Sequence, residues 1–160
     1  MTAIYGLHDL PIKPGPGPQL RENLHSRGPL DQPVVNVTPA VLYQSYHLGG
    51  VTPSASKTNR QAVVEFHNEH MSPQHLAKFF ETFLPDDAQS NKSAVYEYVG
   101  SPNEHPYGFE ADLDIQYIMG ASPGILTEFW MQGQEGFCTD IKGWTTALLA
   151  ADDIPLVHSM

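Results

Sequence analysis

Short apolar runs alternate with segments of helical character from Thr38 onward. The runs are short, and most are rich in β-branched or aromatic residues, which favours buried strands over helices. The segments around them begin with N-cap or proline signals, which predict helices. The expected strands are 61–66, 94–99, 125–131 and 154–159, and the expected helices are 38–48, 72–84, 107–119 and 140–152. This order predicts an α/β fold with a largely parallel sheet, whose carboxyl edge collects ligand and catalytic groups.

Prolines and glycines are concentrated between Pro11 and Pro33, most densely at Pro14–Pro18. Proline removes a backbone donor and favours extended, solvated backbone, so 11–33 is interpreted as a linker. Residues 1–10 are too short to form a domain and look like the last strand of something upstream. The domain with the alternating elements is expected to cover 34–160, and its last strand stops at the chain end, which suggests truncation.

Composition excludes several classes of protein. The formal charge is −10, with no basic stripe, which argues against a nucleic-acid partner. No apolar run approaches the roughly 18–20 residues that span a bilayer. The N-terminus shows no signal peptide, so either the chain is cytosolic or its true beginning is missing. Protonation of all 8 histidines would change the charge from −10 to −2, which is compatible with an acidic compartment.

Glu110 and Asp114 are spaced i,i+4 in the helix expected over 107–119. Carboxylates at this spacing project from one face, so their mutual repulsion should raise one pKa and make the pair titrate jointly. Such a pair can act as a general base at acidic pH, where histidine is already protonated. The alternative is a solvated acidic first turn that the helix dipole favours. Apolar neighbours such as Phe109 and Leu113 suggest that little of this helix faces water.

The segment 108–119, GFEADLDIQYIM, resembles the Glu/Asp helix of the sedolisins, the serine-carboxyl peptidases. The similarity extends in order over nearly the whole chain. Residues 5–11 look like the end of the family's propeptide, 37–48 like the first helix of the mature enzyme, and 133–137 and 156–159 like later segments. The resemblance is specifically to the branch of the family that releases tripeptides. The Glu110-x-x-x-Asp114 pattern is the most specific part of this resemblance.

The resemblance implies a subtilisin-like parallel sheet flanked by helices, here an incomplete, N-terminal portion. It implies that 1–10 ends a propeptide, that 11–33 is an activation linker cut near Val34 to Val37, and that the enzyme is a lysosomal or secreted zymogen that acts on peptides or proteins. By resemblance, Glu110 is the base that deprotonates a nucleophilic serine, and Asp114 orients Glu110. The family's serine lies in a Gly-Thr-Ser loop and its oxyanion aspartate in Ser-Gly-Asp.

Neither of those tripeptides occurs in this sequence. We therefore expect the isolated chain to be inactive, with no cofactor of its own, because the family's calcium site belongs to a C-terminal part that is missing here. The alternative is a truncated, inactive product that binds peptides or a full-length partner. A further alternative is an unrelated α/β module with a solvated acidic helix.

Three other motifs have simple interpretations. His67, His70 and His75 lack a metal-binding pattern, so we expect them to be solvated. Cys138 is expected to be a buried or half-buried thiol without a catalytic role. Asn36 and Asn91 begin glycosylation sequons, of which Asn91 is favoured because Pro39 follows the first.

Overall fold

The computed structural model describes residues 36–49, 51–67, 69–100, 107–133 and 136–160, and all helices and strands named below lie within them. The predictions made for 1–10 and 11–33 lie outside the described residues. Residues Val37–Met160 form one unit. Its elements follow one another as α1 (Pro39–Ser45), β1 (Arg60–Glu65), α2 (Pro73–Phe83), α3 (Pro85–Gln89), β2 (Glu97–Val99), α4 (Phe109–Ala121), β3 (Leu126–Met131), α5 (Phe137–Ala150) and β4 (Val157–Ser159).

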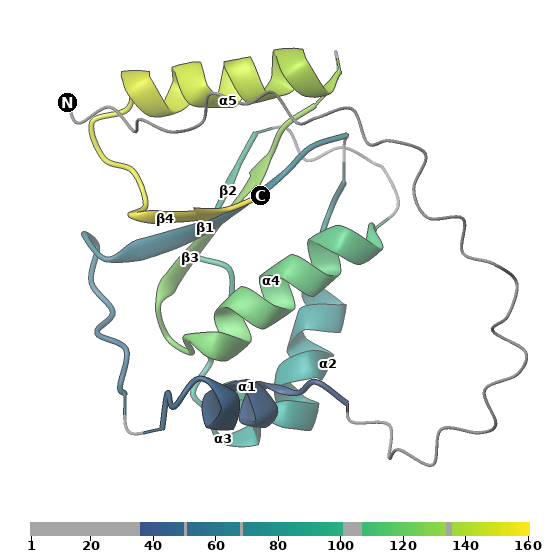
Figure 1. The fold of residues 1–160 in the computed structure, drawn as a ribbon, viewed down its shortest axis with the longest axis vertical. Helices are drawn as coiled ribbons and strands as arrows, with labels where there is room; N and C mark the ends of the chain where they lie inside the picture. Colours follow the sequence, from purple (N-terminus) through teal and green to yellow (C-terminus); the bar gives the residue numbers. More distant parts are fainter. Residues whose placement is uncertain (1–35, 50, 68, 101–106, 134–135) are drawn as a thin grey trace, which may run out of the picture. The chain divides into compact units, whose positions relative to one another are not determined.

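The four strands form one parallel sheet in the order β2-β3-β1-β4. All six residues of β1 are buried, which agrees with its central position. Helix α5 covers one face of the sheet, and α1 to α4 lie on the other side (Figure 1). The expected α/β class, with a parallel sheet flanked by helices, is confirmed, and the arrangement is consistent with part of a subtilisin-like domain.

Side-chain alternation along β1 separates two cores, because successive strand residues point to opposite faces. Val63 packs with buried residues of α2 and α4, including Phe80 and Ile115. Val64 packs with Trp130 and, on α5, with Trp144. The same alternation places Glu65, two residues after Val63, on the face that α4 covers.

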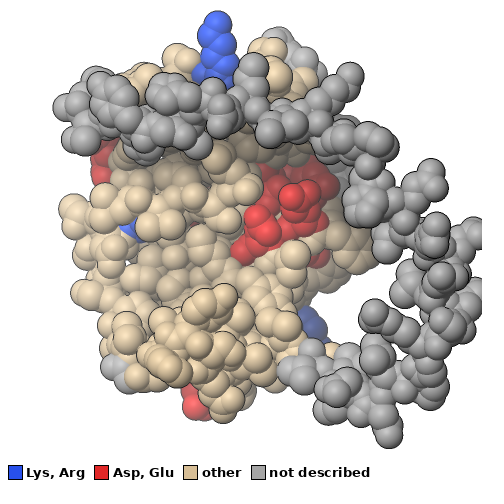
Figure 2. Space-filling model, viewed as in Figure 1, with Lys and Arg blue, Asp and Glu red and all other residues tan. Residues whose placement is uncertain are grey.

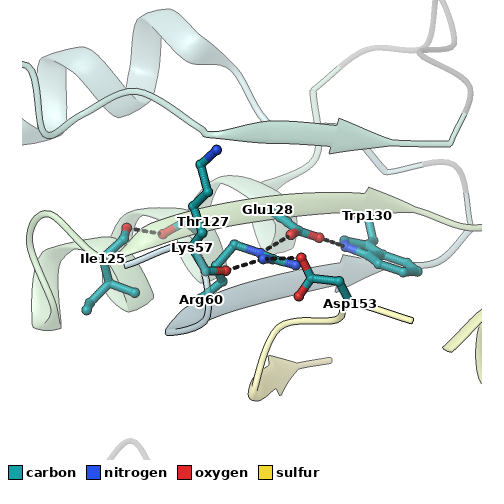
Figure 3. Close-up of polar contacts among 7 residues, drawn as sticks. All are labelled: Lys57, Arg60, Ile125, Thr127, Glu128, Trp130 and Asp153. Atoms are coloured by element: carbon teal, nitrogen blue, oxygen red, sulfur yellow. Dashed lines mark hydrogen bonds and ion pairs between the residues drawn. The ribbon is translucent and has the colours of Figure 1, made fainter. Parts of the chain in front are cut away.

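A buried polar network ties the start of β1 to β3 (Figure 3). Arg60 Nε donates to Glu128 Oε1 at 2.7 Å, and Trp130 Nε1 donates to Glu128 Oε2 at 2.8 Å. Arg60 also bonds the Lys57 carbonyl and, at 3.0 Å, the Asp153 carboxylate after α5. Arg60 and Glu128 are almost fully buried, so both charges depend on these partners.

Several element boundaries differ from those expected. Pro85 ends α2 after Phe83, as expected, but it also occupies the first position of α3, which was not predicted. The strand expected over 94–99 pairs only at Glu97–Val99, and the one expected over 154–159 pairs only at Val157–Ser159. Helix α1 ends at Ser45, and α5 begins at Phe137 rather than at Asp140.

Candidate active site

The carboxyl end of β1 carries a buried glutamate. Glu65 is the last residue of the strand, and its residue surface is 5% exposed. The neighbouring strand continues alongside it, since the Gln132 N–H donates to the Glu65 carbonyl at 2.7 Å. Within the described part of the chain, Glu65 Oε1 is buried and has no hydrogen-bond partner. A buried carboxyl oxygen without a partner is uncommon and requires an explanation.

The loop after β1 holds the first turn of α4. The Gly108 N–H donates to the His70 carbonyl at 2.9 Å, and the Ala111 N–H donates to Glu69 Oε2 at 3.3 Å. A Cβ on Gly108 would overlap the Glu69 carboxylate, so glycine permits this close approach. The Glu69 carboxylate satisfies an amide at the helix N-terminus, where a negative charge is favourable.

Asp112 connects the first turn of α4 to the start of α2 through hydrogen bonds. The Ser72 N–H donates to Asp112 Oδ1 at 2.6 Å, and His75 Nδ1 lies 2.5 Å from Asp112 Oδ2. Ser72 is fully buried and caps α2 through its hydroxyl, which accepts from the His75 N–H at 3.2 Å. These contacts fix the rotation of α4 about its axis, and so determine which side chains of α4 face the end of β1.

Glu110 and Asp114 lie one turn apart on α4, at the spacing that puts them on one face. Glu110 is exposed and Asp114 is half-buried. The expectation that little of this helix faces water is wrong, because Phe109 is 98% exposed and Leu113 is 53% exposed. The helix buries instead a stripe of Ala111, Ile115 and Met119, at intervals of four residues. Within the described part of the chain, no hydrogen bond joins the carboxyl groups of Glu110 and Asp114.

The four acids influence one another electrostatically. Burial, followed by the charges of Asp114, Glu110 and Glu69, raises the pKa of Glu65 to about 8. Burial, then the charges of Glu110 and Glu69, raises the pKa of Asp114. These directions follow from desolvation and from like charges at short range. The expected rise of one pKa in the pair applies to Asp114, although burial contributes more to it than the repulsion from Glu110 that was expected. The cluster also includes two glutamates that were not predicted.

A cavity of about 410 Å³ opens beside this cluster. Figure 2 shows acidic side chains gathered on the face where Figure 1 places the end of β1 and the start of α4. The cavity is lined by Val64, Glu65, Phe66, His67, Glu69, Glu110, Phe137, Ile141 and Met160. It has the size of a pocket for a small ligand or a side chain, and it lies at the edge where parallel sheets place their sites.

Sequence reasoning missed Glu65 and Glu69. Glu65 was interpreted as part of a buried strand, and Glu69 as a neighbour of the histidines. The signal that could have found Glu65 is an acid at the end of an apolar parallel strand, because that end faces the carboxyl edge of the sheet. Glu69 gives no such signal, since its contact with α4 joins residues 42 positions apart.

The remaining candidate residues do not belong to the acidic cluster, although His67 lines the same cavity. His67 and His75 are exposed, but His70 is buried, so the expectation of a solvated residue is wrong for His70. Cys138 is exposed at the start of α5, not buried or half-buried as expected. Asn91 lies on an exposed turn with a φ of 55°, and Asn36 is exposed. Within the described ranges, no group of three His, Cys, Asp or Glu residues could hold a metal ion.

Comparison with known proteins identifies consistent relatives. No family model matches the chain. Tripeptidyl-peptidase 1 of Rattus norvegicus is 28% identical over 163 residues, which cover 98% of this chain and 27% of that protein. The Homo sapiens protein of the same name is 28% identical over 167 residues, with the same coverage. The Mus musculus protein is 28% identical over 132 residues, which cover 79% of this chain and 22% of that protein.

The chain is similar to tripeptidyl-peptidase 1. The resemblance to the sedolisins that the motifs indicated is confirmed by these relatives, and it extends over nearly the whole chain. The chain spans about a quarter (27%) of the length of the rat and human tripeptidyl-peptidase 1 proteins. The comparisons therefore support a relationship to sedolisin-like peptidases at the level of the family. Separately, none of the described helices is long and apolar enough to cross a membrane.

Proposed function

We propose that this chain carries the general base, Glu110, and the acid that orients it, Asp114, of a sedolisin-type peptidase. Peptides or proteins are its substrates, and tripeptides are released from their free N-termini at acidic pH. The observation that carries the proposal is the position of Glu110, which lines the cavity at the carboxyl end of β1 and has Asp114 one turn away on the same face. The similarity to tripeptidyl-peptidase 1 supports it.

The proposed chemistry is acyl transfer. A serine hydroxyl attacks the substrate carbonyl and gives its proton to the Glu110 carboxylate, which later returns that proton to the leaving amine. Burial and the charges of Glu110 and Glu69 raise the pKa of Asp114, so Asp114 retains its proton to a higher pH than an ordinary aspartate does. A glutamate base suits acidic conditions, because a histidine would be protonated there and could not accept the serine proton.

The nucleophile is not recognisable in this sequence, which contains neither Gly-Thr-Ser nor Ser-Gly-Asp. We therefore expect the purified 160-residue chain to show no turnover. We also propose that the parent enzyme is a lysosomal or secreted zymogen, which is cut near Val34 to Val37 during activation. Mapping the N-terminus of the acid-treated parent by mass spectrometry tests that cut, and a new terminus far from this window would contradict it.

The test of function uses the complete open reading frame that encodes this chain. Its product should release tripeptides from an unblocked peptide at acidic pH, and Glu110→Gln should reduce kcat by at least a hundredfold. Glu81→Gln is the matched control, because Glu81 is exposed on α2 and pairs only with Lys78 among the described ion pairs. Full activity in the Glu110 variant would contradict the proposal. A reading frame that ends at codon 160, with an inactive product, would favour a peptide-binding role instead.

A further inference from the structure

The first turn of α4 contacts the start of α2 through a pair of titratable side chains. Asp112 lies two residues after Glu110, and two residues of an α-helix turn through about 200°, so Asp112 projects from the side of α4 opposite to Glu110 and Asp114. Its Oδ1 accepts from the Ser72 N–H at 2.6 Å, and its Oδ2 lies 2.5 Å from His75 Nδ1. The contact therefore holds α4 from the side that faces away from the proposed base.

The strength of this contact depends on charge. The side chain of Asp112 is 15% exposed and that of His75 is 58% exposed, so the carboxylate is largely shielded from water. A neutral imidazole donates an ordinary hydrogen bond to a carboxylate, whereas a protonated imidazole adds an opposite charge and strengthens the bond. Histidine side chains gain this proton as the pH falls below neutrality. The contact should therefore be strongest under acidic conditions.

The described surroundings of His75 make Asp112 its main electrostatic partner. Tyr107, just before α4, packs edge to face on the His75 ring with centroids 5.8 Å apart. Glu69, in the loop before α2, directs its carboxylate to a backbone amide of α4. Lys78, almost one turn further along α2, pairs with a glutamate of its own helix. Among the described residues, Asp112 is thus the only acid that forms an ion pair or hydrogen bond with the His75 ring.

We propose that His75 is a positioning residue for the peptidase reaction, because its protonation strengthens the bond to Asp112 and so holds Glu110 in place at the cavity. This inference rests on the proposed function and concerns how acid acts on the site. Glu110 belongs to the helical turn that Asp112 anchors, so a looser contact shifts Glu110 relative to the serine whose proton it accepts. No hydrogen bond or ion pair of the described residues joins His75 to Glu110, so His75 acts through α4.

A double-mutant cycle on the 160-residue chain tests the ion pair. His75→Asn retains a hydrogen-bond donor, and Asp112→Asn retains an acceptor for the Ser72 N–H, but each variant removes one charge. Urea unfolding of the parent, the two single variants and the double variant measures the coupling between the two charges. The coupling should change the unfolding equilibrium constant at least threefold at pH 5, and the factor should approach one at pH 8. The same factor at both pH values, or no coupling at pH 5, would overturn the inference.

Turnover by the product of the complete open reading frame tests the positioning role. Per folded molecule, as verified by circular dichroism, His75→Asn should lower kcat at least threefold at pH 4.5 and change KM less than twofold. The loss should shrink as the pH rises toward 7. A residue that served only to stabilise the fold would leave kcat per folded molecule unchanged, and that result would contradict the proposal.

His47→Asn is the matched control. The His47 ring is exposed and bonds only the Gln44 carbonyl, at 3.0 Å, and asparagine tolerates the φ of 56° at this position. This variant should follow the parent at every pH. Turnover that depends on Glu110 but not on His75 would refute this inference alone, whereas turnover that is independent of Glu110 would refute the proposed function.

Discussion

Glu65 lies at the end of a central strand, among three other acids and largely out of water. Its pKa of about 8 lies above the ordinary 4.5, so at intermediate pH the folded chain holds a proton that the unfolded chain has released. Raising the pH through this window therefore favours the unfolded chain, because Glu65 ionises more easily in the unfolded chain than in the folded one. The contribution of this group to stability is complete below about pH 4.5 and is lost as the pH rises toward 8.

Glu65→Gln should abolish this pH dependence. Relative to the parent, the variant's free energy of unfolding should increase by about 1.4 kcal/mol for each pH unit between pH 4.5 and 8, because glutamine does not titrate. Urea unfolding of both chains across this range measures the difference. Glu81→Gln, at an exposed position, should follow the parent throughout. Parallel curves for the Glu65 variant and the parent would contradict the environment described for Glu65.

The first turn of α4 is the element that brings Glu110 and Asp114 to the end of β1. Its position depends on contacts with the loop after β1, above all on the close approach of Glu69 to Gly108 and Ala111. An alanine at 108 retains an acceptable backbone conformation but displaces the Glu69 carboxylate. The charged hydrogen bond to Ala111 would then be lost.

Gly108→Ala should lower the free energy of unfolding by about 0.5–1.5 kcal/mol, because the flexible Glu69 side chain can move away from the new Cβ at the loss of one part-buried hydrogen bond. Gly143→Ala is the matched control, since Gly143 lies within α5 and a Cβ there meets nothing within 4 Å. That control should be more stable than the parent by about 0.5–1 kcal/mol, because alanine favours helix. Chemical denaturation of the two variants and the parent measures these changes in the free energy of unfolding. Equal changes of the same sign would contradict the role given to Gly108.

The buried network at the start of β1 predicts a second contrast. Glu128→Ala leaves Arg60 buried without its main partner, and should lower the free energy of unfolding by about 3–5 kcal/mol. Asp153→Ala removes the other carboxylate, whose side chain is 71% exposed, and should cost at most about 1 kcal/mol. Thermal and urea unfolding compare the two. A larger loss for the Asp153 variant would mean that the ion pair with Glu128 does not hold Arg60.

Local patterns predicted the elements well because each signal acts within a few residues. Thr38-Pro39 and Ser72-Pro73 begin α1 and α2 as expected, and both cap side chains accept the expected backbone bonds. The strands expected to begin at residues 94 and 154 are shorter in the structure, because pairing depends on the neighbouring strand and not on local propensity. The sequence predicted the spacing of Glu110 and Asp114. It could not predict their exposure, because exposure depends on which face of α4 packs against α2 and β1.

At the scale of the whole molecule, acids gather at the carboxyl edge of a parallel sheet, in a chain whose formal charge is −10. The raised pKa values of Glu65 and Asp114 both mean that protons bind to the folded chain. Mildly acidic conditions should therefore stabilise the cluster rather than disrupt it. This property suits the acidic conditions in which the proposed peptidase would act.

The charge of Glu110 contributes to the raised pKa of Asp114, one turn away on α4. This influence is tested most directly by following the side-chain carboxyl carbon signals of the 160-residue chain by NMR as the pH is varied. The Asp114 midpoint should lie above the ordinary 3.8, and Glu110→Gln should lower it, because the Glu110 charge contributes to the rise. Glu81→Gln should leave it unchanged. An Asp114 midpoint at its ordinary value, unaffected by removal of the Glu110 charge, would contradict the account.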